Sequence, residues 1–240
     1  MGTTTPNANL ILDGHKLQWH YDRVQAWEAG ERIAPVSVDL ALSRACQASC
    51  RGCYAVLQEP QERSQIEVSH AKQLLDDFAE IGVRGVSLIS DGESTLSPAY
   101  VPFILKAAEL GIDVGNATNG WRFFPEMAEQ VLPHLKWVRF TVLAGKPSSY
   151  VRMMHHDSSA MNIYWTAMHN ISEAVRIKRK KKLDVTLGIQ TFVLPQDTDE
   201  VIPFAQLGLD LGVDYALVKH TSDDEMGSMG VDYNAYGSVI

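Results

Sequence analysis

All three cysteines of the 240-residue chain lie in one segment, CQASCRGC, at positions 46–53. Their spacing is Cys46-x3-Cys50-x2-Cys53. Three thiolates from one short loop can each ligate one iron of a [4Fe–4S] cluster, which leaves the fourth iron without a protein ligand. An open iron can bind a small molecule and pass it an electron. The spacing therefore predicts an iron–sulfur site with one open iron.

Two other kinds of site fit part of this pattern. A structural zinc site normally has four protein ligands, and the sequence contains no second Cys-x2-Cys pair, although His70 could complete the set. A thioredoxin-type redox pair would use Cys50 and Cys53 and leave Cys46 without a role. Cysteines that act as small core residues would not gather in a loop rich in Arg, Gln, Ser and Gly. The iron–sulfur interpretation accounts for all three thiols, while the zinc and redox alternatives stay open.

The elements that must position this segment alternate along the chain. Buried or alternating apolar runs predict strands at 34–43, 83–90, 112–118, 136–143, 183–195 and 213–220. Helical spacing predicts helices at 17–30, 69–82, 97–111, 125–132, 161–180 and 197–212. Such alternation is typical of parallel βαβ units, in an open doubly wound sheet or a partial barrel. In both folds the functional groups gather at the carboxyl ends of the strands, and the cysteines follow the first one.

The composition narrows the classes of partner and compartment. The formal net charge of −8 argues against a general nucleic-acid-binding surface. The basic run RIKRKKK (176–182) is typical of a solvated helix end whose cations complement the helix dipole. No apolar run reaches the ~18 residues of a membrane span, and the N-terminus lacks the basic-then-apolar order of a signal peptide. We expect a protein of the reducing cytoplasm, without a membrane span or a disulfide framework.

The cysteine motif, placed after the first strand of a βα series, resembles that of the radical SAM superfamily. The resemblance implies a partial (β/α)6 barrel, which selects the barrel over the open sheet. It implies that Cys46, Cys50 and Cys53 hold a [4Fe–4S] cluster whose open iron chelates S-adenosylmethionine (SAM). It further implies an oxidoreductase-type reaction: an external donor of the flavodoxin or ferredoxin type supplies an electron, and SAM is cleaved to a 5′-deoxyadenosyl radical. That radical then abstracts a hydrogen atom from the substrate.

Later strand ends resemble the SAM pocket of the same superfamily. In ISDGESTL (89–96), Gly92 would let the backbone approach the ligand and Glu93 would receive the methionine ammonium, although Ser94 replaces the usual proline. The other matched positions are Asn119 in ATNGWRF, Thr141 at the fourth strand, Gln190 at the fifth, and the backbone near Val218 at the sixth. Each of these taken alone also fits an ordinary turn or core strand.

The resemblance divides the chain into a leader with a preamble helix (1–33), a barrel (34–220) and a polar tail or incomplete cap (221–240). The substrate it implies is a small molecule or peptide, with a sugar, a nucleoside, a lipid precursor and a small peptide all compatible. Substrate contacts are possible at His155, His156, Lys219 and His220, which fall near strand tops. Three other functions stay open: a glycyl-radical-type activase acting on a partner protein, a methyl- or methylthiotransferase, and a non-catalytic metal-binding or scaffold protein.

Overall fold

A computed structural model describes residues 19–53, 64–89, 91–154, 161–223, 227 and 230–238. The chain divides into two compact units, Met1–Pro35 and Val36–Ile240. The first unit contains helix α1 (Tyr21–Glu28), and the Arg23 guanidinium ties it to the following segment by donating to the Ala34 carbonyl at 2.5 Å. None of the helices in the described part of the chain is long and apolar enough to cross a membrane.

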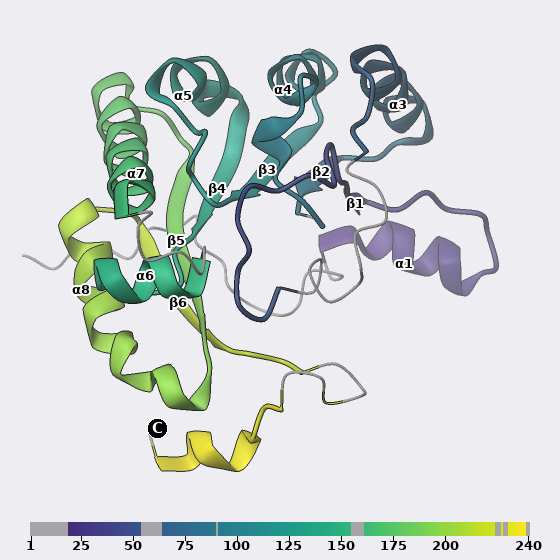
Figure 1. The fold of residues 1–240 in the computed structure, drawn as a ribbon. Coiled ribbons are helices and arrows are strands. Elements are labelled where there is room, and N and C mark those ends of the chain that lie inside the picture. Colours follow the sequence, from purple (N-terminus) through teal and green to yellow (C-terminus); the bar gives the residue numbers. More distant parts are fainter. Residues whose placement is uncertain are drawn as a thin grey trace, which may run out of the picture. The chain divides into compact units, whose positions relative to one another are not determined.

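Six parallel strands form the sheet of the second unit, and their order in the sheet is their order in the chain (Figure 1). The strands are β1 (Ser37–Asp39), β2 (Gly85–Leu88), β3 (Asp113–Thr118), β4 (Leu135–Thr141), β5 (Thr186–Val193) and β6 (Tyr215–His220). A doubly wound sheet would reverse its strand order at a switch point, and this one does not. Among the described residues the two outer strands, β1 and β6, do not pair. The predicted partial (β/α)6 barrel is therefore confirmed.

Helices follow the strands and cover the outer face of this open barrel, as Figure 1 shows for the row α3, α4, α5 and α7. Their bounds are α3 (Val68–Ile81), α4 (Tyr100–Glu109), α5 (Pro125–Val131), α7 (Met161–Lys181) and α8 (Val201–Leu211). The main core lies between these helices and the sheet. Outward-facing strand residues such as Val138 and Phe140 are fully buried there, and the Phe140 ring meets the Phe123 ring edge-on at 5.4 Å.

The inner face of the barrel pairs large side chains with glycines. Gly115 lies beside Trp137 in the register, and a Cβ at Gly115 would come within 2.0 Å of the indole. Gly188 lies beside Tyr215 in the register, and a Cβ at Gly188 would come within 2.2 Å of the tyrosine ring. Alternating large and small residues in this way is how narrow barrels fill their interior. The rings occupy the amino-terminal part of the interior, so the carboxyl ends of the strands are left for the pocket described below.

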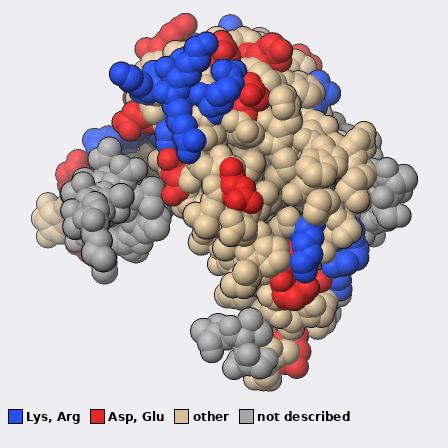
Figure 2. All heavy atoms as spheres, turned by 90° about the vertical axis from the view of Figure 1, so that its left-hand side faces the viewer, with Lys and Arg blue, Asp and Glu red and all other residues tan. Residues whose placement is uncertain are grey.

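The basic run at the end of α7 lies at the amino end of β5 and is neutralised in part by acidic neighbours. Figure 2 shows these Lys and Arg side chains gathered at one end of the face, with Asp and Glu beside them. The ion pairs are Arg176–Glu173 (2.8 Å), Lys178–Asp214 (2.5 Å) and Lys181–Glu129 (3.2 Å). This arrangement agrees with a solvated helix end.

Three parts of the structure differ from the sequence prediction. An additional helix, α6 (Pro147–Met154), follows β4. In place of the predicted helix at 197–212, a 3₁₀ segment, η4 (Pro195–Glu200), kinks at Asp197, which has non-helical backbone angles, and is followed by α8. Strand β1 is shorter than the predicted run. In the tail, a 3₁₀ segment, η5 (Tyr233–Ser238), is held by a 2.7 Å hydrogen bond from the Tyr236 hydroxyl to the Val193 carbonyl.

Candidate functional site

A pocket of about 480 Å³ opens at the carboxyl ends of the strands. It is lined by all three cysteines and by five of the six residues predicted to contact SAM: Gly92, Glu93, Asn119, Thr141 and Gln190. The sixth, Val218, is not among the described lining residues. Its neighbour Lys219 does line the pocket, and successive residues of a strand point to opposite faces, so the Val218 side chain points away. Residues distant in sequence are therefore brought together at the edge where parallel βα folds place their chemistry.

The cysteine loop is docked onto the carboxyl end of α6. The backbone N–H of Ser49 donates to the Met154 carbonyl at 3.0 Å, and that of Arg51 donates to the Met153 carbonyl at 2.8 Å. The Cys50 thiol also contacts the Met154 sulfur at 3.6 Å. Helix α6 thus fixes the path of the chain between the first and third cysteines, a role that the sequence patterns did not reveal.

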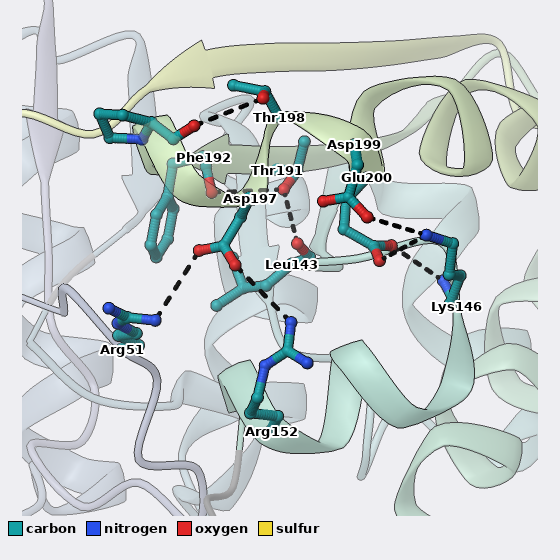
Figure 3. A network of polar contacts seen from close by, with 11 residues as sticks. Arg51, Leu143, Lys146, Arg152, Thr191, Phe192, Asp197, Thr198, Asp199 and Glu200 are labelled. Atoms are coloured by element: carbon teal, nitrogen blue, oxygen red, sulfur yellow. Dashed lines mark hydrogen bonds and ion pairs between the residues drawn. The ribbon is translucent and has the colours of Figure 1, made fainter. Parts of the chain in front are cut away.

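A buried carboxylate adds a second tether to the loop (Figure 3). Asp197, in η4, has a side chain only 6% exposed and lies between two guanidinium groups: Arg51 of the cysteine loop at 3.8 Å and Arg152 of α6 at 3.6 Å. Burial of an unpaired carboxylate is costly, and the two neighbouring cations offset that cost. Asp197 therefore links the cysteine loop, α6 and the end of β5.

The protein environment disfavours free thiolates at Cys46 and Cys50. Loss of solvation raises the pKa of Cys46 to about 11, although part of the residue is exposed at the rim. Burial raises the pKa of the half-buried Cys50 further, and the neighbouring Cys53 and Cys46 sulfurs add to the effect. Three thiolates that repel one another within one loop would need a cationic partner, and iron atoms would supply one. The donor set therefore fits a cluster held by three cysteines.

No three His, Cys, Asp or Glu side chains in the described ranges converge closely enough to hold a single metal ion.

Glu93 is a buried carboxylate that lines the pocket, and it is 3% exposed. Its Oε1 accepts hydrogen bonds from the Thr95 N–H (3.1 Å), the Thr95 hydroxyl (2.7 Å) and the Thr118 hydroxyl (2.8 Å). Its Oε2 accepts a single bond, from the Asn119 N–H at 2.8 Å. Burial raises the pKa of Glu93, and these hydrogen bonds act in the opposite direction. Glu93 thus joins the turns after β2 and β3, and Oε2 retains capacity for one more donor.

Asn119 connects the turn after β3 to the cysteine loop. Its side-chain nitrogen donates to the Cys46 sulfur at 3.8 Å. Its side-chain oxygen accepts from the Gln47 amide at 3.1 Å and from the Trp121 N–H at 3.0 Å. The predicted Asn119 is therefore within reach of a sulfur ligand, and its amide orientation is fixed from two sides.

Gly92 allows the turn after β2 to approach the chain that leads into the cysteines. A Cβ at this position would lie 2.1 Å from the Ser43 carbonyl oxygen. The next residue, Glu93, donates its N–H to the Ala45 carbonyl at 2.9 Å. The glycine is thus required by contact between two backbone segments of the site.

The β4–β6 side of the pocket carries a cation that sequence reasoning missed. Arg139 precedes Thr141 by two residues on β4, so both face the interior, together with Gln190 of β5. The available signal was a charged residue in phase with a predicted pocket residue. Lys219 and His220 line the pocket as well. Of the other predicted contacts, His155 and His156 lie outside the described residues.

Comparison with known proteins shows similarity in structure alone. No protein-family model and no curated protein sequence matches the chain. Streptococcus suis SuiB bound to S-adenosylmethionine aligns with a TM-score of 0.65 at 16% identity, covering 90% of this chain and 48% of that one. SuiB bound to precursor peptide SuiA gives a TM-score of 0.63 at 16% identity, covering 91% and 47%. Native anSMEcpe with bound AdoMet gives 0.62 at 15% identity, covering 79% and 52%.

The chain thus spans about half the length of these three structures. At such identities the likeness establishes the fold. This fold, a partial (β/α)6 barrel, is the one that the resemblance to the radical SAM superfamily implied.

Proposed function

We propose that the chain is a radical SAM enzyme. Cys46, Cys50 and Cys53 hold a [4Fe–4S] cluster, and SAM occupies the adjoining pocket. When bound, the cluster supplies the electron that cleaves SAM to a 5′-deoxyadenosyl radical, which takes a hydrogen atom from the substrate. The observation that carries the proposal is the single pocket that unites three cysteines, Glu93 and Gln190 at the carboxyl ends of the strands.

The residues of the pocket have distinct tasks in this proposal. The cysteines bind iron as thiolates, so loading releases protons from thiols whose pKa is raised. Asn119 donates to the Cys46 sulfur, and hydrogen bonds to cluster sulfurs tune the reduction potential. Oε2 of Glu93 accepts the methionine ammonium.

The far side of SAM rests on the remaining strands. Thr141, at the end of β4, contacts the ribose and the carboxylate of SAM, Gln190 contacts the adenine, and the backbone near Val218 meets the adenine edge. The buried Oε1 of Gln190 has no hydrogen-bond partner among the described residues, which fits a group that awaits a ligand. A pocket of about 480 Å³ also falls within the usual size of small-molecule sites.

The substrate class favoured by the similar structures is a peptide, because one of them holds SuiB together with precursor peptide SuiA. The electron comes from an external donor of the flavodoxin or ferredoxin type. We assign the chemistry to the barrel, residues 34–220, with 1–33 and 221–240 as flanking segments. A reducing cytoplasm is the compartment in which three unpaired cysteines and an oxygen-sensitive cluster persist.

The proposal is tested by anaerobic reconstitution with iron and sulfide, followed by incubation with SAM and dithionite. A brown protein with about four irons per chain that releases 5′-deoxyadenosine is expected. A colourless protein that binds one zinc would refute the proposal and favour a structural metal site. A brown protein that does not cleave SAM would favour a non-catalytic iron–sulfur protein.

The ligand assignment is tested by Cys50→Ala. This variant should contain fewer irons and release no 5′-deoxyadenosine, because the cluster loses one of its three protein ligands. Gln73→Ala, on the exposed side of α3, is the control and should behave as the parent protein. Cleavage of SAM by Cys50→Ala at the parent rate would show that Cys50 is not a cluster ligand.

A further inference from the structure

The charged groups of the pocket are distributed unevenly between its two sides. The cysteines, Asp91 and Glu93 come from the segments after β1 and β2. Arg139 and Lys219 come from β4 and β6. One side is therefore anionic once the thiols are deprotonated, and the other is cationic. A single site with opposite charges on its two sides is suited to ligands that carry an anionic group at the β4–β6 end.

Arg139 is a half-buried pocket cation for which the described structure offers no counter-ion. Its side chain is half-buried, its buried Nε has no hydrogen-bond partner, and it forms no ion pair with a described residue. The other guanidinium groups near the site do have acidic neighbours, since Arg44 contacts Asp91 and Arg51 contacts Asp197. A half-buried charge without a partner is costly, so it points to a ligand that supplies the missing charge.

Aromatic rings hold the guanidinium in place. Its central carbon lies 5.7 Å from the centroid of the Trp137 ring, within the range of a cation–π contact. In the sheet register, Arg139 of β4 is paired with Gly188 of β5, and Gly188 is paired with Tyr215 of β6. The Tyr215 ring fills the space above Gly188, at the same level as Arg139. The direction left open to the guanidinium is the pocket that it lines.

We propose that Arg139, with Lys219, binds an anionic group of the second substrate, a carboxylate or a phosphate. This inference rests on the proposed function, in which SAM occupies the side of the pocket near the cysteines. The planar guanidinium fork matches both anions with two parallel hydrogen bonds. The substrate is therefore an acid: a peptide held by a carboxylate, or a phosphorylated small molecule.

The carboxylate of SAM is a poorer candidate for this position. The resemblance to the radical SAM superfamily implies that this carboxylate chelates the open iron, and the proposed function also places it against the end of β4 at Thr141. Arg139 is two residues earlier than Thr141 on β4, which places it ~7 Å further from the carboxyl end of the strand. The guanidinium thus serves a deeper part of the pocket than the one assigned to the SAM carboxylate.

Binding of simple anions to the iron-loaded protein at saturating SAM tests the proposal. The probes are inorganic phosphate and glutarate, measured by equilibrium dialysis at an ionic strength held constant with chloride. At least one probe should bind to a single site, and Arg139→Gln should weaken that binding by ~10- to 100-fold, the value of a charge-assisted hydrogen bond. Tighter binding of phosphate assigns a phosphorylated substrate, and tighter binding of glutarate assigns a carboxylate.

Matched variants distinguish the contribution of the planar guanidinium geometry to anion binding from the contribution of the positive charge. Arg139→Lys keeps the positive charge and loses the planar guanidinium, so its affinity for the probes should fall between those of the parent and Arg139→Gln. If Arg139→Gln does not fold, Arg139→Lys takes its place in the test. Lys219→Gln should weaken binding by a smaller factor. Arg84→Gln, an exposed arginine at the amino end of β2, is the control and should bind the probes as the parent does.

Three results would overturn the anion site. They are no binding of either probe to the parent protein, equal binding to the parent and Arg139→Gln, and a loss of SAM affinity in Arg139→Gln at least as large as the loss of probe affinity. The last would assign Arg139 to the SAM carboxylate. Iron content and SAM cleavage are measured on the same parent preparation. A failure of the proposed function is thereby distinguished from a failure of the anion site.

Discussion

At the scale of single residues, the structure shows what each predicted position contacts. The sequence identified Gly92 and Glu93 as a pair because they resemble a ligand-binding turn. In the structure the glycine is required by the backbone of Ser43 and Ala45, and the carboxylate is engaged by Thr118 and Asn119. These contacts join segments that are far apart in the chain. Local sequence does not encode them, which is why the sequence predicted the residues and not their partners.

The close approach at Gly92 leads to a prediction for Gly92→Ala. The new methyl group would meet the Ser43 carbonyl at 2.1 Å, so the backbone must move and the cysteine loop must shift with it. We expect fewer irons per chain after reconstitution and a free energy of unfolding lower by about 3 kcal/mol. Urea denaturation and iron analysis measure both quantities.

Gly85→Ala is the matched control, because a Cβ there would make an ordinary contact with the Asp113 carbonyl at 3.6 Å. It lies on β2, at the opposite end from the pocket. Parent-like iron content in Gly92→Ala would show that the two loops can separate without affecting the cysteines.

At the scale of elements, the strands and five helices (α3, α4, α5, α7 and α8) were predictable because their apolar spacing agrees with end signals such as Gly82 and Gly212. Helix α6 was not, since its eight residues include Ser148 and Ser149, which favour helix formation only weakly. Pro147 at its first position is a start signal that marks it in hindsight. Burial of Tyr150, Met153 and Met154 stabilises the helix, and that packing comes from tertiary structure.

The tether between the cysteine loop, α6 and η4 gives a prediction for Asp197→Asn. The neutral amide would leave Arg51 and Arg152 without their shared carboxylate, in a place where Asp197 is nearly inaccessible to water. We expect the loop to open more often, so that a ferrous chelator removes iron faster, and the free energy of unfolding to fall by about 1–3 kcal/mol.

Asp199→Asn provides the control two residues away. Asp199 pairs with Lys146 through a side chain that is 72% exposed, and exposed pairs contribute little. Its iron-release rate should match that of the parent. If Asp197→Asn and Asp199→Asn release iron at the same rate, the tether does not hold the loop.

At the scale of the whole molecule, the two ends of the barrel have different roles: the carboxyl ends of the strands carry the pocket, and the amino ends carry stabilising ion pairs. The alternating elements already predicted that chemistry gathers at the carboxyl ends of the strands. They did not predict Arg139, because deciding which strand residues face inward requires the register between strands. At the amino ends lie ion pairs such as Lys178–Asp214. Stability and chemistry therefore depend on different ends of the barrel.

This separation predicts how iron removal combines with a substitution at the amino end. Iron binds the folded pocket, so stripping it with a chelator should lower the melting temperature of the parent protein. Asp214→Ala removes the acceptor of a 2.6 Å hydrogen bond from the Leu187 N–H and the partner of Lys178. We expect it to destabilise the loaded and the stripped protein equally, by about 1 kcal/mol, since distant sites act additively. Thermal unfolding of all four samples measures the coupling, and an iron-dependent shift that differs between Asp214→Ala and the parent would show that the two ends are linked.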